Sequence, residues 1–309
     1  MRELILPQLA PREPTVSVVT YVRNACGTIS KALESIVNQD YPYLQLIVVD
    51  GASTDGTQDI IARYADRIAV FVSEPDSGPL EAATKGLALV TGDIVLFVMA
   101  DDWLVEGAIR RLADEFTRQP TCGIISFGAR IEAQGEAGRR IVLERYGCEN
   151  RLDLRNLLGI PLTAARAWRR ELMDLIGGLD PHYPAAHDRE WFMRAWIAGV
   201  STTEINDILY IYTQHAGSTT LGGDPRRIIA YLEEHVGLAG MWLRYVSGAE
   251  AAMVRDWRRL QLKEGLLIAL RLKRIGLIGR WLVLVLARDP AAAGDALKYC
   301  LRRLFRMVA

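Results

Sequence analysis

The sequence Ile94-Val-Leu-Phe-Val-Met-Ala-Asp-Asp102 sets seven mostly apolar residues directly before two carboxylates. A second apolar run, residues 44–49, ends in the same way at Asp50. Apolar runs of this length with β-branched residues are typical of buried strands in a parallel sheet. In doubly wound folds, the carboxyl ends of such strands border the ligand crevice. The two runs therefore predict an α/β fold with acidic side chains at one edge of its sheet.

Polar loops and amphipathic helices alternate with these strands. The strand-like run Val16-Ser-Val-Val-Thr20 leads into the loop Tyr21-Val-Arg-Asn24 and then into a predicted helix. The stretch Val48-Val-Asp-Gly-Ala-Ser-Thr-Asp-Gly-Thr57 joins a strand end to turn glycines and helix-capping residues. Ser73-Glu-Pro-Asp-Ser-Gly78 is a turn cluster before a predicted helix at residues 80–90. Four strands are thus expected to alternate with three helices before residue 103.

The order of these blocks resembles the family 2 glycosyltransferases, inverting enzymes that use sugar nucleotides and have the GT-A fold. The matching blocks are VVTYVRNACGTISKALESIVNQDYP, VVDGASTDGT, SEPDSG, ATKGLALVTGDIVLFVMADD and HDREWFMRAWIAG. The resemblance covers roughly the first 220 residues. It implies a Rossmann-like, mostly parallel central sheet flanked by helices, followed by a helical C-terminal region. Two features depart from the family pattern: Thr84 stands where an Asn is common, and Tyr21-Val-Arg-Asn24 is longer than the usual Tyr-Asn.

The resemblance also implies roles for individual residues in binding a nucleotide-sugar donor, with UDP as the expected nucleotide. Asp50 would accept the imide N–H of the base, Thr20 and Tyr21 would line the base and ribose, and Asp101 would lie near the ribose. Lys85 would assist as a point charge, although a lysine on an amphipathic helix is more often simply solvated. The full set of expected donor-binding residues is Thr20, Tyr21, Asn24, Asp50, Asp76, Lys85 and Asp101.

A divalent cation, Mn²⁺ or Mg²⁺, is the expected cofactor. The resemblance gives Asp102 the role of its principal ligand, on the donor diphosphate, and adds His215 from the turn cluster Thr213-Gln-His-Ala-Gly-Ser-Thr219. Such cations prefer oxygen ligands and need only one or two protein carboxylates beside the phosphates. The alternatives are that Asp101 and Asp102 cap the next helix and that His215 is a solvated loop residue.

An inverting displacement needs a base that takes the proton from the acceptor hydroxyl. The last matching block places Asp188 in that role, at the start of a helix whose apolar face anchors it. The alternative is a carboxylate that only stabilises the helix N-terminus. Glu190 is the second candidate and faces another side of the helix.

Composition places the chain in the cytoplasm and argues against other kinds of site. The 309 residues are 50% hydrophobic, which is enough for one or two domains with an ample core. The four cysteines lack a C-x-x-C pattern, so neither a disulfide framework nor a zinc site is expected. Residues 1–14 lack the charged start and apolar core of a signal peptide.

Charge is distributed unevenly along the chain. Residues 255–309 contain 13 Lys/Arg and 4 Asp/Glu, whereas the whole chain is formally neutral. We expect a catalytic domain at residues 1–222 and a helical, basic and apolar region at residues 223–309. A final amphipathic helix at residues 297–308 suits an anionic membrane surface, at the cytoplasmic face of the inner membrane. Alternatively it packs on the catalytic domain or on a second copy in a homo-oligomer. No nucleic-acid-binding motif is present.

The sequence thus predicts a metal-dependent inverting glycosyltransferase that acts on a glycan or lipid-linked acceptor. The main alternative is a non-catalytic GT-A-like module that binds a nucleotide sugar or glycan, or docks a synthase at the membrane. A base opposite the leaving group, at Asp188, argues against that alternative. A Rossmann dehydrogenase is excluded because no G-x-G-x-x-G follows the first strand.

Overall fold

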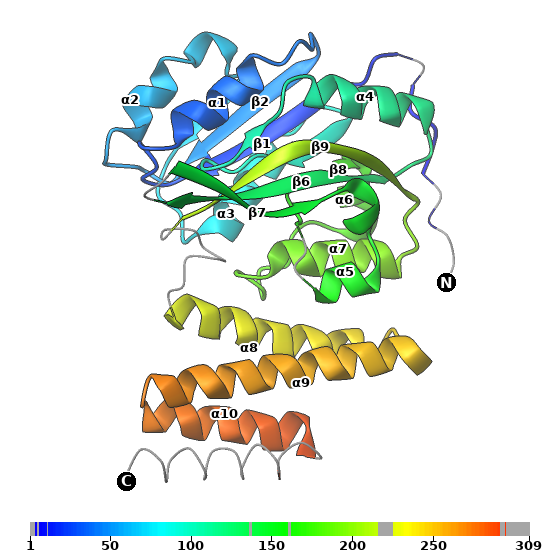
Figure 1. Cartoon of the computed structure of the whole chain (residues 1–309). Helices are drawn as coiled ribbons and strands as arrows, with labels where there is room; N and C mark the ends of the chain where they lie inside the picture. The colour runs from blue at the N-terminus through cyan, green and yellow to red at the C-terminus, as the bar shows by residue number, and fades with distance from the viewer. Residues whose placement is uncertain are drawn as a thin grey trace. The chain divides into compact units, whose positions relative to one another are not determined.

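The structure is a computed structural model that describes residues 4, 6–10, 12–135, 138–159, 162–215, 225–290 and 294. The chain divides into two compact units, Met1–Ser218 and Thr219–Ala309. The boundary expected at residue 222 lies outside the described residues. Figure 1 shows the course of the chain within each unit.

The first unit opens with strands and helices in alternation, as the sequence predicts. Its first elements are β1 (Val16–Val22), α1 (Ile29–Val37), β2 (Leu44–Asp50), α2 (Thr57–Ala62), η1 (Ala65–Arg67), β3 (Val70–Ser73), α3 (Pro79–Ala88) and β4 (Ile94–Phe97). The remaining elements are β5 (Trp103–Leu104), α4 (Ala108–Arg118), β6 (Ile124–Gly135), β7 (Gly138–Arg145), η2 (Gly147–Glu149), α5 (Leu154–Leu158), β8 (Arg166–Arg169), α6 (Glu171–Ile176), α7 (His187–Ile197) and β9 (Thr202–Gln214).

One sheet runs through this unit in the order β3-β2-β1-β4-β8-β6-β9-β5, with β7 paired to β6. The strands β3, β2, β1 and β4 are parallel, which is the expected Rossmann-like half. Strand β8 then pairs antiparallel with both β4 and β6, and β6 runs parallel to β9. The second half of the sheet is therefore mixed, and β8 joins it to the parallel half.

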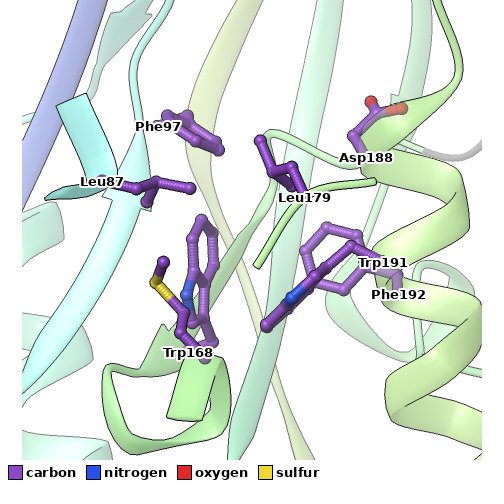
Figure 2. Close-up of a pocket in the computed structure, with 8 residues that line it drawn as sticks. Leu87, Phe97, Trp168, Leu179, Asp188, Trp191 and Phe192 are labelled. Carbon is purple, nitrogen blue, oxygen red and sulfur yellow. The ribbon is translucent and has the colours of Figure 1, made fainter. Parts of the chain in front are cut away.

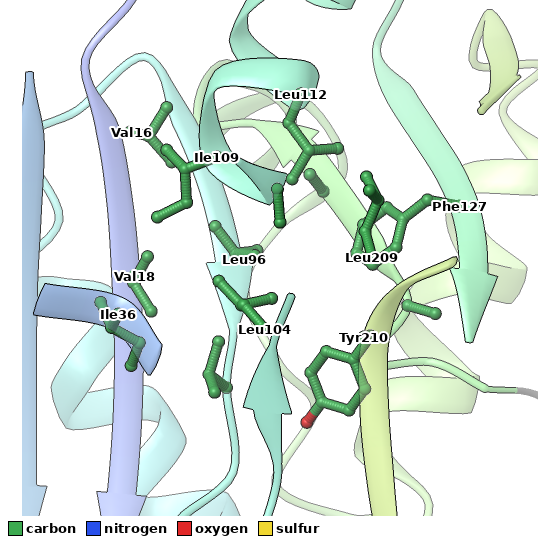
Figure 3. Close-up of a cluster of buried hydrophobic side chains, with 14 of the residues drawn as sticks. Val16, Val18, Ile36, Leu96, Leu104, Ile109, Leu112, Phe127, Leu209 and Tyr210 are labelled. Atoms are coloured by element: carbon green, nitrogen blue, oxygen red, sulfur yellow. The ribbon is translucent and has the colours of Figure 1, made fainter. Parts of the chain in front are cut away.

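Apolar residues from the strands and from α1 and α4 form the main core on one face of the sheet. Figure 3 shows part of this core, to which β1, β4, β5, β6, β9, α1 and α4 contribute. Its labelled residues are Val16, Val18, Ile36, Leu96, Leu104, Ile109, Leu112, Phe127, Leu209 and Tyr210. The apolar positions of α1 recur with helical spacing, so its inner face is wholly buried. This packing fixes the strand ends that carry the acidic residues.

Strand β4 is shorter than the apolar run that predicts it. The run extends to Ala100, but pairing with β1 ends at Phe97 opposite Val19. The chain then turns, and the backbone N–H of Asp102 donates to the carbonyl of Met99. This turn places Asp101 and Asp102 just beyond the sheet edge.

The second unit contains α8 (Pro225–Trp242), α9 (Gly248–Arg271) and α10 (Ile275–Arg288). These three helices share a core of aliphatic side chains around Trp281. In the part of the chain that is described, no helix is both long and apolar enough to cross a membrane. The amphipathic helix expected at residues 297–308 lies outside the described residues.

Candidate functional site

The carboxyl ends of β1, β2 and β4 bring together most of the residues that the sequence singles out. Register pairs Val22 of β1 with Asp50 of β2, and the turn after β4 carries Asp101 and Asp102. Tyr21 lies between these groups. Burial, followed by the negative charges of Asp188, Asp101 and Asp102, raises the pKa of the Tyr21 phenol. Tyr21 therefore stands within electrostatic reach of both the strand-edge carboxylates and the carboxylate of α7.

Asp50 is fully buried at the end of β2. Its Oδ2 accepts hydrogen bonds from the hydroxyl of Ser73 (2.7 Å) and the backbone N–H of Ser53 (3.0 Å). These donors hold the carboxylate in one orientation. Thr20 has no exposed surface, and its hydroxyl has no partner among the described residues. Thr20 is therefore enclosed by protein atoms, as Asp50 is, and the contact with the donor expected of it stays a prediction.

Four hydrogen bonds join the loop after β1 to the loop after β2. Asn24 contributes two of them: its backbone N–H donates to the Ser53 hydroxyl (2.7 Å), and its side-chain oxygen accepts from the N–H of Thr54 (2.9 Å). The N–H groups of the next two residues donate to Thr57 and Asp55. Asn24 has a positive φ of 52°, a conformation that Asn tolerates better than most residues. Asn24 therefore connects the two loops through its backbone and its side chain.

Asp76 lies directly over Gly51, the residue after Asp50. A Cβ on Gly51 would come within 2.4 Å of the Asp76 carboxylate oxygen, so a larger residue there would displace the Asp76 side chain. The other Asp76 oxygen accepts the N–H of Gly78 at 2.9 Å. Asp76 therefore borders the same loop as Asp50.

Lys85 on α3 is engaged by protein groups. Its ammonium lies 2.9 Å from Glu74 and 2.8 Å from Glu81, and it donates to the carbonyl of Pro75. The hydrogen bonds to Glu81 and Glu74 raise the pKa of Lys85. The expected contact with the donor would require Lys85 to leave these partners.

Asp101 and Asp102 occupy different environments although they are neighbours in the sequence. The Asp102 side chain is buried, and its oxygens accept from the Tyr210 hydroxyl (2.6 Å) and the backbone N–H of Thr213 (2.7 Å). Burial, and then the charge of Asp101, raises the pKa of Asp102 well above its usual range. Asp101 is 29% exposed, and its Oδ2 lies 2.9 Å from Nε2 of His215, which is 33% exposed. The solvent-accessible pair is therefore Asp101 and His215.

This pair offers one oxygen and one nitrogen ligand, which suits Mn²⁺ and, through the oxygen, Mg²⁺. Among the residues that the structure describes, no group of three His, Cys, Asp or Glu side chains is arranged to hold a metal. A cation at Asp101 and His215 would thus need further oxygens from a ligand such as a diphosphate.

Asp188 is the second residue of α7 and is half-buried. Its Oδ2 accepts from the hydroxyl of Thr163, and its Oδ1 accepts from the backbone N–H of Arg189 (2.6 Å). The second candidate base, Glu190, is buried and forms a bidentate ion pair with Arg194, with distances of 2.7 and 2.8 Å. Burial raises the pKa of Glu190, and its oxygens are held by Arg194. Of these two residues, only Asp188 lies beside a pocket and is partly exposed.

That pocket contains about 260 Å³ of space, part of it open to solvent. Figure 2 shows the rings of Phe97, Trp168, Trp191 and Phe192 that line this pocket, with Asp188 at its upper edge in the view. The lining residues are Leu87, Phe97, Trp168, Met173, Leu179, Asp188, Trp191 and Phe192. Ring contacts continue from Tyr21 through Phe97 and Trp168 to Trp191, with centroids 5.7, 5.3 and 5.3 Å apart. Packed rings therefore connect the strand edge to the helix of Asp188.

Sequence reasoning missed several residues that shape this site. Tyr210 and Thr213 of β9 hold Asp102, and Thr163 holds Asp188. Arg166 is fully buried near Asp188, its guanidinium 5.1 Å from the Phe192 ring centroid, and burial lowers the pKa of Arg166 to about 10. No local pattern marks these residues, because their partners lie far away along the chain.

Comparison with known proteins gives a consistent result. The family model described as Glycosyl transferase family 2 matches residues 17–177. Over 126 residues the chain is 35% identical to TuaG of Bacillus subtilis, which is named as a glycosyltransferase of teichuronic acid biosynthesis; the match covers 40% of this chain and 49% of TuaG. A GalNAc(5)-diNAcBac-PP-undecaprenol beta-1,3-glucosyltransferase of Campylobacter jejuni is 34% identical over 103 residues, covering 32% of this chain and 33% of that protein. These matches span half or less of the relatives' length.

Among solved structures, S. aureus TarS 1-349 in complex with UDP-GlcNAc has a TM-score of 0.67 at 18% identity. The match covers 94% of this chain and 88% of that chain. The mannosyltransferase PcManGT from Pyrobaculum calidifontis, in complex with GDP-Man and Mn²⁺, has a TM-score of 0.56 at 20% identity, with 97% and 82% covered. At these identities the likeness establishes the fold, which is the predicted GT-A fold.

Proposed function

The chain belongs to glycosyl transferase family 2 and is a glycosyltransferase, and on this premise we propose that it transfers a sugar from a UDP-sugar, with inversion, to a hydroxyl of a glycan or lipid-linked acceptor. The observation that carries the proposal is that the strand end leading to Asp101 lies close to Asp188: Phe97 is the last residue of β4, and Phe97 and Asp188 line the same pocket. An inverting transfer needs an anchor for the leaving diphosphate on one side of the sugar and a base on the other.

In this proposal Asp50 and the joined loops bind the nucleotide base. Asp101 and His215 hold a divalent cation, in place of the expected Asp102, because the Asp102 oxygens are already bound to Tyr210 and Thr213. When bound, the cation stabilises the negative charge of the departing diphosphate. Asp102 then acts as a support that fixes the turn carrying Asp101.

Asp188 is the proposed general base. Its carboxylate accepts the proton of the acceptor hydroxyl as the hydroxyl oxygen bonds to the anomeric carbon of the donor sugar. The bond from that carbon to the phosphate oxygen breaks at the same time, and UDP leaves with the electron pair. The hydrogen bond from Thr163 orients the Asp188 carboxylate for this step.

Calorimetric titration with UDP and GDP, with and without Mn²⁺, tests the donor site. We expect UDP to bind in a Mn²⁺-dependent manner. Asp101→Asn should weaken this binding at least about tenfold, since losing even a residue that only orients a metal ligand usually costs about 10- to 100-fold in metal affinity. Asp102→Asn is the matched control and should chiefly lower the Tm. If Asp102→Asn abolishes the Mn²⁺ dependence and Asp101→Asn does not, the ligand assignment is wrong. Absence of binding to either nucleotide would favour the non-catalytic binding module.

The second unit supports a proposal of contact with an anionic membrane surface. Ile275, Val283 and Leu286 of α10 are 85%, 63% and 58% exposed and share one helical face. Residues 255–309 carry the excess of basic residues that attracts anionic lipid. An apolar face beside basic residues is the pattern of helices that lie in a membrane interface. A lipid-linked acceptor would be met at that surface.

A further inference from the structure

Arg166 of β8 is a buried cation with few partners. Its side chain has no exposed surface, and within the part of the chain that is described its Nε and Nη1 have no hydrogen-bond partner. Nη2 donates to the carbonyl oxygen of Asn150 (2.8 Å) and to the side-chain oxygen of the same residue (3.4 Å). A buried guanidinium with unsatisfied donors costs stability, so its presence indicates a role other than stabilising the fold.

Two contacts place Arg166 beside the part of α7 that carries Asp188. Its guanidinium carbon lies 5.1 Å from the ring centroid of Phe192. Phe192 follows Asp188 by four residues on α7 (Figure 2), and residues at this spacing share one face of a helix. Thr163, which donates its hydroxyl to Asp188, precedes Arg166 by three residues in the chain. Arg166 and Thr163 therefore approach the same end of α7.

The charges of Arg166 and Asp188 interact. Burial lowers the pKa of Arg166 to about 10, and the negative charge of Asp188 is the largest effect that opposes this lowering. The guanidinium therefore stays protonated at neutral pH. The interaction is mutual: a carboxylate that favours the protonated guanidinium is itself favoured in its ionised form by that guanidinium.

We propose that Arg166 is a positioning residue that acts through Asp188, because its positive charge keeps the base in the carboxylate form that accepts a proton. The inference rests on the proposed function, since it takes Asp188 as the base. Half-burial of Asp188 favours the neutral acid, which has no capacity to take the proton of the acceptor hydroxyl. The charge of Arg166 opposes this effect from a buried position, where solvent screens it little.

Arg169, on the same strand, shows what a structural arginine does. It is also buried, but it pairs with Glu171 and donates to two backbone carbonyl oxygens. These partners neutralise its charge and tie the N-terminal segment to β8. Among the residues that the structure describes, no carboxylate pairs in this way with Arg166, so its charge remains available to act on Asp188.

Other titratable and charged groups lie on the elements around Asp188. They are Tyr21 of β1, Asp101 and Asp102 after β4, Asp153 and Arg155 at the start of α5, Glu171 and Asp174 of α6, Asp180 and His182 of the loop before α7, and His187, Arg189, Glu190 and Arg194 of α7. Glu190 is neutralised by Arg194, and the Tyr21 phenol is uncharged because burial, followed by the charge of Asp188, raises its pKa. All of these groups are the same in the wild type and in the Arg166 variants below. A difference between these proteins therefore reports the charge at position 166.

The test titrates Asp188 directly by NMR in the full chain, with ¹³C at the aspartate carboxyl carbons. The Asp188 signal is the one that is missing in Asp188→Asn. Arg166→Met and Arg166→Gln both remove the positive charge, and Gln retains an N–H donor for Asn150. We expect both to move the titration midpoint of Asp188 to higher pH by about one unit, the low end of the effect of a nearby opposite charge. The acid limb of the pH profile of kcat for a UDP-sugar donor should move by the same amount.

Arg169→Met is the matched control. It breaks an ion pair and hydrogen bonds to backbone carbonyls, so it should lower the Tm but leave the titration midpoint of Asp188 in place. Either Arg166 variant decides the question if the other does not fold. The inference fails if the folded variants shift the midpoint by less than about half a unit, or if Arg169→Met shifts it equally.

Failure of the inference and failure of the proposed function give different results. An unmoved midpoint leaves the proposed function intact, because Asp188→Asn would still reduce transfer. Wild-type turnover in Asp188→Asn overturns the assignment of the base and, with it, the role of Arg166.

Discussion

Asp188 and Glu190 lie two residues apart on α7, and their partners give them different roles. Asp188 accepts hydrogen bonds from a hydroxyl and a backbone N–H and lines a pocket, whereas Glu190 is buried in an ion pair with Arg194. A partly exposed carboxylate with neutral donors is suited to accept a proton. A buried carboxylate that is paired with a guanidinium, as Glu190 is with Arg194, is suited to stabilise the helix.

Replacing Asp188 by Asn should therefore lower kcat by about 100-fold or more, the usual contribution of a general base. The Kd for UDP should change little, because the proposed nucleotide site lies at the strand edge. Steady-state kinetics with a UDP-sugar donor, combined with calorimetry, separates the two quantities.

Glu190→Gln is the matched control for Asp188→Asn. It breaks a buried ion pair, so it should lower the Tm while kcat falls far less than in Asp188→Asn. Wild-type turnover in Asp188→Asn would mean that another residue is the general base.

Lys85 gives a second prediction at this scale. Because its ammonium is held by Glu74 and Glu81, Lys85→Met should leave the Kd for UDP within about threefold of the wild-type value and cause a small loss in Tm. Calorimetry in Mn²⁺ measures both binding and its enthalpy. A loss of tenfold or more in affinity would mean that Lys85 leaves its glutamates to contact the donor, as the family resemblance implies.

Which single residues act could be predicted only in part from the sequence. The spacing of Glu81 and Lys85 is four residues, so their pairing on one helix face was open to sequence reasoning. The different partners and exposure of Asp101 and Asp102 could not be predicted from the sequence. The difference depends on Tyr210 and Thr213, more than 100 residues away along the chain, and only the folded sheet brings them to one of the two carboxylates.

At the scale of elements, the packing of α9 on α10 depends on a glycine. A Cβ on Gly265 would lie 2.3–2.4 Å from ring atoms of Trp281, so the indole packs directly on the α9 backbone. Glycine inside a helix normally costs about 1 kcal/mol relative to alanine. Here the steric conflict outweighs that cost, because the Trp281 ring is itself buried.

We therefore expect Gly265→Ala to destabilise the second unit by about 1–3 kcal/mol, the usual effect of overpacking. Gly279→Ala on α10 is the matched control: nothing lies within 4 Å of its added Cβ, so it should stabilise by up to about 1 kcal/mol. Urea denaturation followed by circular dichroism measures both. Equal effects of the two substitutions would contradict the close packing of Trp281.

Elements with a strong local pattern were predictable, and those set by long-range pairing were not. The parallel strands β1, β2 and β4 and the helix α1 follow from apolar runs and helical spacing. In the middle of the chain, no local pattern marks β7 and β8. Strand β8 has only four residues, Arg166–Arg169, two of them arginines, and is buried because strands from both sides pair with it.

For the molecule as a whole, the proposed membrane contact makes a measurable prediction. Val283→Glu combined with Leu286→Glu should weaken sedimentation of the full chain with anionic vesicles by about tenfold or more. Each apolar side chain is worth about 1.5–3 kcal/mol when removed from water, and about 1.4 kcal/mol corresponds to a factor of ten.

Ile141→Glu with Val142→Glu is the matched control, because these two residues are similarly exposed on β7 of the first unit. It should bind vesicles as the wild type does. If the wild type does not sediment with vesicles, or if both double variants behave alike, the membrane proposal fails.

An α/β unit followed by a helical region could be predicted from the sequence, whereas the acceptor could not. A catalytic α/β unit followed by helices follows from the change in pattern after residue 217, where glycines and a proline cluster. The acceptor does not follow from the sequence, and the pocket beside Asp188 is lined by side chains from several elements. Of its lining residues, only Asp188 and three apolar positions, Leu87, Trp191 and Phe192, fell within regions to which the sequence gave a definite helical role.

If the loops after β1 and β2 bind the nucleotide base, as we propose, the hydrogen bonds between them have a consequence for how nucleotide preference can evolve. Asn24 donates to Ser53 and accepts from Thr54, and the next two N–H groups bind Thr57 and Asp55, so neither loop can change shape alone. A surface ordered before the ligand arrives loses little entropy on binding, which favours affinity. It also makes mutations epistatic: a substitution that reshapes one loop should be tolerated only with a compensating substitution in the other. Variants with altered base selectivity are therefore expected to arise as pairs of changes, one from each loop.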